Sequence, residues 1–194
     1  VVGTFSALRQ YSFFDNLFTI FAFFAVSVPN FFFALMGLFI FAVTLELPEG
    51  FFHTYTGHSL DVLRVERPPA PTPARTDAGI LTVRWADPAP CVQFRDADGR
   101  WRDIACEPGA ILVNIGDLLA RWTNDRWASP VHRVAPARGE AHRPHRSATF
   151  SHDGDFDALV TPLPTCVDDD NPARYAPVTV AAHLAERRGW DLTG

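Results

Sequence analysis

The fold is decided by the stretch Asn114-Ile115-Gly116-Asp117-Leu118-Leu119-Ala120-Arg121-Trp122 and by Ser129-Pro130-Val131-His132-Arg133-Val134 shortly after it. Ahead of this stretch, Pro108-Gly109 predicts a turn, and the apolar residues 110–115 predict a buried strand. Residues 117–122 predict a short helix, and residues 132–134 predict another strand. The pattern therefore places one histidine, His132, on a strand that follows a strand–turn–helix unit.

Short apolar runs separated by Pro, Gly and Asp continue on both sides of this stretch, which is typical of an all-β sandwich or barrel. Further strands are expected at 60–65, 80–85, 92–95, 101–104 and 147–150, and a second helix at 178–188. The sequence Asp96-Ala97-Asp98-Gly99-Arg100 predicts a hairpin turn between two of these strands. Many strands with little helix predict a mainly β fold, a double-stranded β-helix of the jelly-roll class.

The charge and cysteine content limit the partners of the protein. The 194 residues carry a formal net charge of −5, and the basic residues are scattered arginines without any lysine. This distribution of charge lacks the clustered basic residues that a nucleic-acid-binding surface needs. Cys91, Cys106 and Cys166 lack metal-site spacing, so reduced and mostly buried thiols are expected.

The front of the chain has a different composition from the rest. Residues 17–43 contain no charged side chain, and a membrane-spanning helix needs about 20 apolar residues. Such a helix would begin near Asp15 and end before Glu46, and Pro29 would kink it. The sequence thus predicts a hydrophobic segment at 1–45, membrane-associated if its helix inserts, and a separate domain at 46–194.

Residues 3–9, 11–15 and 27–31, which include Ser27-Val28-Pro29-Asn30-Phe31, resemble one segment of a dipeptide/oligopeptide-type ABC transporter permease. In that family the segment is a cytoplasmic turn followed by a transmembrane helix. The resemblance covers about 45 residues and leaves out the other spans and the coupling loop. A permease fragment is therefore one alternative identity for the chain.

The later part of the chain resembles iron(II)/2-oxoglutarate-dependent oxygenases of the isopenicillin N synthase-like family. The resemblance rests on Asp77-Ala78-Gly79-Ile80-Leu81-Thr82, on the stretch around His132, and on the closing segments 163–166 and 171–179. It covers about residues 47–184. It implies a jelly-roll dioxygenase that uses Fe(II), 2-oxoglutarate and O2 to oxidise a small-molecule substrate in the cytoplasm.

The resemblance also assigns metal ligands. These enzymes hold iron with a His-x-Asp pair and a later histidine, which correspond here to Asp77 and His132, while Arg75 occupies the first histidine position. A guanidinium stays protonated and has no lone pair for a metal. The sequence therefore predicts a metal site weakened at position 75, unless His53 or His58 replaces the missing ligand in space.

The co-substrate motif departs from the family in a parallel way. The family binds the distal carboxylate of 2-oxoglutarate with Arg-x-Ser, which aligns with His145-Arg146-Ser147. Ser147 matches, His145 stands at the arginine position, and Arg146 is expected on the opposite face of the strand from Ser147. The sequence thus predicts an impaired dioxygenase, with a non-catalytic β-domain on a membrane anchor as the other alternative.

Overall fold

The computed structural model describes residues 36–37, 39–48, 50–66, 71–86, 92–104, 107, 109–134 and 146–189. The chain divides into two compact units, Val1–Gly37 and Leu38–Gly194. Most of the predicted membrane segment 17–43, and most of the permease-like segment, therefore lies outside the described residues. Among the residues that are described, no helix is both long and apolar enough to cross a membrane.

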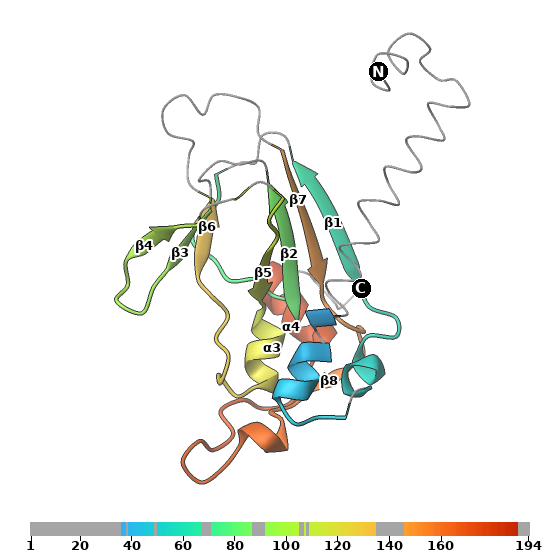
Figure 1. The fold of residues 1–194 in the computed structure, drawn as a ribbon. Helices are drawn as coiled ribbons and strands as arrows, with labels where there is room; N and C mark the ends of the chain where they lie inside the picture. Colours follow the sequence, from blue (N-terminus) through green and yellow to red (C-terminus); the bar gives the residue numbers. More distant parts are fainter. Residues whose placement is uncertain are drawn as a thin grey trace, which may run out of the picture. The chain divides into compact units, whose positions relative to one another are not determined.

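A four-stranded antiparallel sheet forms one wall of the second unit (Figure 1). Its strand order is β1-β7-β2-β5, with bounds β1 Asp61–Glu66, β7 Ser147–His152, β2 Leu81–Ala86 and β5 Leu112–Ile115. Because β7 lies between β1 and β2, strands that are distant in sequence become neighbours. This order places His152 beside Leu81, at the end of β2 that follows Asp77, and Ser147 beside Ala86 at the other end.

A three-stranded antiparallel sheet forms the second wall, in the order β4-β3-β6. It consists of β3 (Val92–Arg95), β4 (Trp101–Asp103) and β6 (His132–Val134). The predicted turn joins β3 to β4: the Asp96 N–H donates to the Arg100 carbonyl at 2.9 Å, and Gly99 has φ +78°. Two antiparallel sheets with little helix confirm the predicted mainly β architecture.

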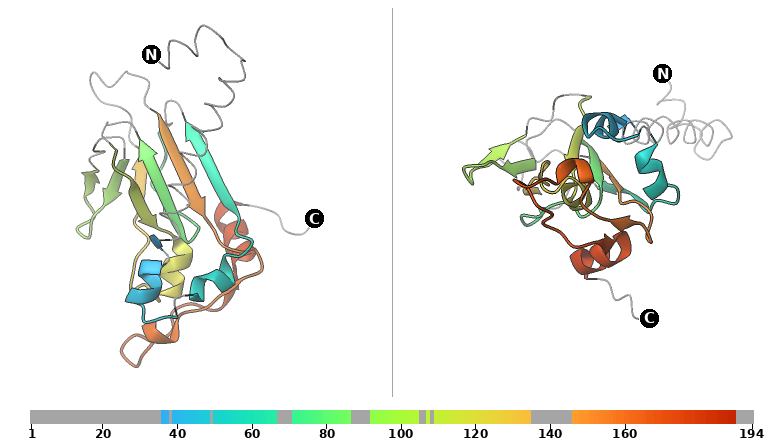
Figure 2. Two further views of the ribbon diagram at one scale, coloured as in Figure 1. Left: turned by 45° about the vertical axis from the view of Figure 1, so that its right-hand side comes forward. Right: turned by 90° about the horizontal axis from the view of Figure 1, so that it is seen from below.

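The helices gather at one end of the four-stranded sheet, together with the two-stranded sheet of β8 (Leu159–Val160) and β9 (Val178–Thr179) (Figure 2). They include η1 (Phe51–Tyr55), α3 (Asp117–Trp122), η2 (Pro164–Cys166) and α4 (Val180–Arg188). This end of the domain is the one at which the chain passes from residue 77 into β2 and from β5 into α3.

An aromatic cluster fills the core at the helical end. Trp122 is 1% exposed, and its ring lies 5.4 Å from Phe52 and 5.2 Å from Tyr55 between centroids. Helical residues 39–44 join the same unit, since Phe41 packs at 5.0 Å from Trp127. The end of the apolar segment thus packs with the β-domain, and the division proposed at residues 45 and 46 remains a prediction.

Several element boundaries differ from the sequence expectation by one or two residues, and two of these differences have identifiable reasons. Strand β5 begins at Leu112 because the turn around Gly109 (φ +79°) continues through Ala110, whose N–H donates to the Glu107 carbonyl. Helix α4 begins at Val180 because the Thr179 side chain caps it by accepting from the Ala182 N–H at 3.2 Å.

Candidate metal and carboxylate site

The loop that carries Asp77 is locked to the start of α3 by backbone hydrogen bonds. Gly116 N–H donates to the carbonyl of Ile80 at 2.8 Å, Asp117 N–H to that of Asp77 at 2.7 Å, and Leu118 N–H to that of Gly79 at 3.0 Å. This close approach explains the glycine at position 116, because a Cβ there would lie 2.0 Å from the Gly79 carbonyl oxygen. The motif that decides the fold therefore also fixes the position of Asp77.

Asp77 and His132 meet inside the domain. Strand β6 places the His132 side chain at 4% exposure, with Nε2 3.6 Å from Oδ1 of Asp77. The Nδ1 atom lies 3.1 Å from the Pro130 carbonyl oxygen, which can only accept a hydrogen bond, so Nδ1 carries the proton. In the neutral ring, Nε2 then presents its lone pair toward Asp77. The second carboxylate oxygen of Asp77 accepts from the Asn114 side chain at 3.3 Å.

Arg75 stands beside this pair. Its N–H and carbonyl form two hydrogen bonds with the carbonyl and N–H of His132, each of 2.9 Å, as an isolated antiparallel bridge. Residues paired in this way direct their side chains to the same face of a sheet. Position 75 is therefore placed to contribute a ligand next to His132, but its exposed arginine side chain has no lone pair to give.

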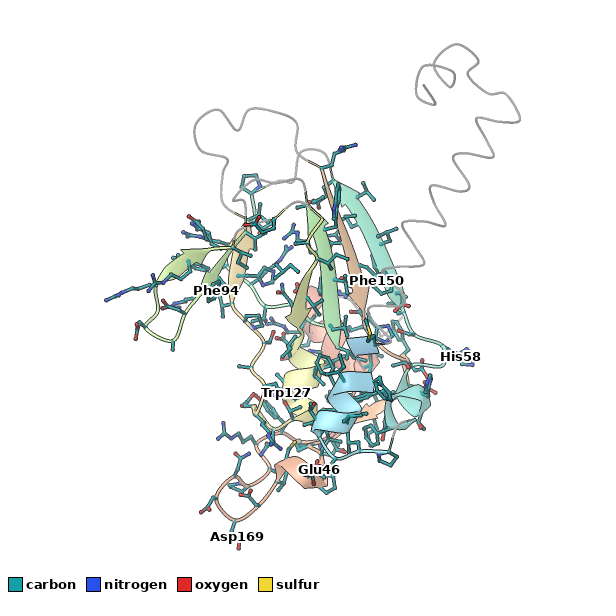
Figure 3. All side chains as sticks on the ribbon, viewed as in Figure 1. Glu46, His58, Phe94, Trp127, Phe150 and Asp169 are labelled. Carbon is teal, nitrogen blue, oxygen red and sulfur yellow. The ribbon has the colours of Figure 1, made fainter. Side chains whose placement is uncertain are left out.

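The other candidate histidines lie elsewhere. His53, on η1, and His58 are both exposed, and His58 points outward at the edge of the domain (Figure 3). His152 is engaged with Asp61 at 2.8 Å. No group of three or more His, Cys, Asp or Glu side chains that could hold a metal occurs within the described part of the chain. Two metal-binding side chains, Asp77 and His132, are thus brought together without a third.

Helix α4 supports the Asp77 loop, a role that the sequence did not indicate. His183 donates from Nε2 to the Ala78 carbonyl at 3.1 Å, and burial lowers the pKa of His183, which keeps the imidazole neutral. Arg187 forms an ion pair with Asp117 at 2.9 Å. The contact between His183 and Ala78 could not be predicted from a local sequence pattern, because more than a hundred positions separate the two residues.

The same helix holds a buried carboxylate. The Asp153 side chain is fully buried and pairs with Arg188 at 2.6 Å. Burial raises the pKa of Asp153, while the neighbouring Arg188 opposes that rise. A Cβ at Gly79 would collide with this carboxylate, so the glycine of the Asp77 motif is also a packing requirement.

A cavity of about 30 Å³ contains the Asp77–His132 pair, and we call it the polar cavity. Both sheets and the segment before β2 line it, and Thr82, Arg84 and Thr149 contribute from β2 and β7. Ser147, the first residue of β7, is 2% exposed. Arg146 directly precedes the strand and is exposed, whereas His145 lies outside the described residues.

Solved structures share this arrangement of sheets. A putative 2OG-Fe(II) oxygenase family protein from Caulobacter crescentus is similar with a TM-score of 0.74 and 30% identity, over 84% of this chain and 57% of that one. The dioxygenase for auxin oxidation in rice is similar with a TM-score of 0.65 and 26% identity, over 76% of this chain and 52% of that one. The fold is that of the jelly-roll oxygenases.

The sequence comparison agrees. Residues 59–152 match the family model described as the 2OG-Fe(II) oxygenase superfamily. A 2-oxoglutarate-Fe(II) type oxidoreductase of Emericella nidulans is 32% identical over 153 residues, which are 73% of this chain and 43% of that protein. Homoarginine-6-hydroxylase 2-ODD-233 of Oryza sativa subsp. japonica is 30% identical over 66% of this chain and 39% of its own length. These comparisons support a 2OG-Fe(II) oxygenase superfamily domain at residues 59–152, and the chain spans less than half the length of these two relatives.

The donors at the site suit iron(II) in part. A carboxylate and an imidazole are side chains that ligate non-haem Fe(II), and Asp77 and His132 lie 3.6 Å apart. Position 75 supplies a positive charge in place of the third donor. The site therefore fits a metal held by two side chains, with its remaining positions open to water or co-substrate.

Proposed function

We propose that residues 46–194 are the catalytic domain of an iron(II)- and 2-oxoglutarate-dependent dioxygenase of the isopenicillin N synthase-like family, which oxidises a small-molecule substrate with O2. The observation that carries the proposal is the approach of His132 Nε2 to Asp77 Oδ1 at 3.6 Å inside the polar cavity. An imidazole nitrogen and a carboxylate oxygen that face one another at this distance suit a shared divalent ion.

The residues have separate roles in this proposal. Asp77 and His132 hold the iron, which activates O2 when bound. Pro130 orients the His132 ring and Asn114 orients the Asp77 carboxylate, as outer-shell hydrogen bonds do in metal sites. Arg75 weakens metal binding because it adds a positive charge where the family has a ligand.

The co-substrate site of the proposal contains Ser147, with His145 and Arg146 as the neighbouring candidates from the family motif. Ser147 is buried and close in sequence to both. The substrates that appear in the names of the relatives belong to those proteins. For this chain we propose a small organic molecule and a cytoplasmic site, where 2-oxoglutarate and ferrous iron are supplied.

The test is an anaerobic Fe(II) titration of the full chain and of the Asp77→Ala and His132→Ala variants. Loss of either ligand is expected to weaken binding at least tenfold. His58→Ala serves as the matched control, because His58 is exposed and does not line the polar cavity. Equal Fe(II) affinity in the wild type and both ligand variants would refute the proposal.

Arg75 itself favours one other function, a β-domain of the same ancestry that no longer holds metal. In that case the wild-type chain takes up no Fe(II) in the same titration. The membrane span proposed at 17–43 is a separate question, which membrane fractionation of the full chain answers: recovery in the aqueous fraction would dispose of the anchor.

A further inference from the structure

One face of the four-stranded sheet lines the polar cavity, and the strand register shows which side chains share it. Thr149 on β7 lies opposite Arg84 on β2, and both residues line the cavity. Ser147 is two residues from Thr149 and therefore lies on the same face of β7. Arg84 and Ser147 are diagonal neighbours across the pair, about 7–8 Å apart at Cα, which is within reach of an arginine side chain.

Each of these two residues has a buried polar atom without a hydrogen-bond partner among the described residues. The atoms are Nε of Arg84 and Oγ of Ser147. Buried polar groups are almost always paired, because leaving one unsatisfied is costly, and a guanidinium also keeps its charge. Two unsatisfied donors on one face of a cavity wall are the partners that a carboxylate needs.

The charges around the cavity favour an anion. Three arginines and two carboxylates line it: Arg64, Arg75, Arg84, Glu66 and Asp77. None of the three arginines forms a side-chain ion pair within the described residues. Glu66 lies opposite Ser147 on the other side of β7, yet it forms no ion pair with Arg84 there. An arriving carboxylate therefore meets a net excess of guanidinium groups.

Arg84 also borders a second cavity, of about 90 Å³, whose other lining residues are mostly apolar. Val92, Ile104 and Leu112 are among them. Along β2, Arg84 lies two residues, or roughly 7 Å, beyond Thr82, which pairs with the Asn114 that contacts Asp77. The separation along β2 between the Asp77 end and Arg84 is thus comparable to the length of a short carbon chain with a carboxylate at each end.

We infer that Arg84, together with the Ser147 hydroxyl, binds the distal carboxylate of the 2-oxo-dicarboxylate co-substrate, in place of the arginine missing at position 145. This inference rests on the proposed function for the identity of the ligand. In this inference the carboxylate is bound by a guanidinium on β2, whereas the sequence motif predicts a binding group just before β7. Arg146 is the competing cation, and it is exposed at the start of the strand.

The test is a calorimetric titration of the metal-free full chain with 2-oxoglutarate and with glutarate, a diacid that has no oxo group to chelate iron. Arg84→Met is expected to weaken binding of both diacids at least tenfold, and Ser147→Ala severalfold. Arg84→Lys, which keeps the charge without the planar fork, is expected to fall between wild type and Arg84→Met. Arg126→Met is the charge control, since Arg126 is exposed and outside both cavities.

Circular dichroism melts establish that each variant is folded, and Arg84→Lys covers the case in which Arg84→Met is not. Equal diacid affinity in wild type and Arg84→Met overturns the inference, as does loss of binding in Arg146→Met alone. Failure to bind glutarate in the wild type also overturns it. Because the titration contains no metal, a chain that binds diacids through Arg84 but takes up no Fe(II) refutes the proposed function and supports the inference.

Discussion

Replacing Arg75 with histidine should convert the site from two protein ligands to three. The antiparallel bridge places position 75 directly beside His132, and a histidine there would direct its ring to the same face. The backbone hydrogen bonds of the bridge do not depend on the side chain, so the substitution leaves the local fold unchanged. Both the removal of a positive charge and the gain of a ligand favour metal binding.

The two contributions can be estimated separately. Cα atoms of a hydrogen-bonded antiparallel pair lie about 5.5 Å apart. For a separation of the same order between the guanidinium and the metal, about 5.5 Å, a unit charge beside a divalent cation costs about 1.5 kcal/mol in a water-like dielectric, the appropriate limit because Arg75 is exposed. That energy corresponds to roughly tenfold in affinity. Arg75→Met, which removes the charge alone, should therefore bind Fe(II) about tenfold more tightly than wild type.

Arg75→His should gain this tenfold and at least about a further tenfold from the added nitrogen ligand, which is about 100-fold in total. The assay is anaerobic Fe(II) titration of the wild-type chain, Arg75→Met and Arg75→His, with a competing chelator to hold free metal in range. Identical affinities for Arg75→His and Arg75→Met would show that no third ligand forms. An Arg75→His affinity equal to that of wild type would refute the whole electrostatic and ligand argument.

Three further outcomes follow from packing and charge. Gly116→Ala should lower the free energy of unfolding, measured by urea denaturation, by about 2–4 kcal/mol, because the added Cβ displaces three backbone hydrogen bonds. Gly50→Ala is the control: a Cβ there has nothing within 4 Å, so the free energy of unfolding should change by less than about 0.5 kcal/mol. Arg188→Met should lower the stability measured by thermal melts by about 3 kcal/mol, because the buried Asp153 carboxylate loses its charged partner. Arg187→Met breaks the more exposed pair with Asp117 and should lower stability by about 1 kcal/mol or less. Equal losses of stability in the two variants would contradict this reasoning. Burial lowers the pKa of His183, so its contribution to the free energy of unfolding is complete above about pH 6.5 and decreases as the pH falls below that value. The slope of this decrease is at most about 1.4 kcal/mol per pH unit, and His183→Gln should remove it.

Much of the fold could be predicted because local pattern and tertiary role agree. A strand before Gly116 and a short helix after it were both expected, although the apolar run at 110–115 predicted a buried strand and β5 is only partly buried, with Val113 exposed. The hairpin at Gly99 follows from turn chemistry alone. The strands β8 and β9 were not predicted because two residues carry no periodicity, and their pairing depends on the helices around them.

The candidate site was predictable only where one segment carries its signal. Asp77 and His132 were predicted from the resemblance to the family motif, and the structure brings them together, while their role as metal ligands remains a prediction. The position of Arg84 at the cavity requires the pairing of β2 with β7, which joins segments more than sixty residues apart. From the local sequence pattern alone, an arginine in an apolar strand is expected to face solvent. The roles of Arg146 and Ser147 remain predictions.

The backbone bridge between Arg75 and His132 has a consequence for how such a site changes over time. The bridge is made of main-chain atoms, so the geometry at position 75 persists whichever side chain occupies it. The domain can therefore lose a ligand without losing its shape, and it can regain one through a single substitution. The backbone at position 75 is fixed by main-chain hydrogen bonds, so different side chains can be placed there without rebuilding the site. The chain is therefore a suitable scaffold for introducing other donor atoms and other metals.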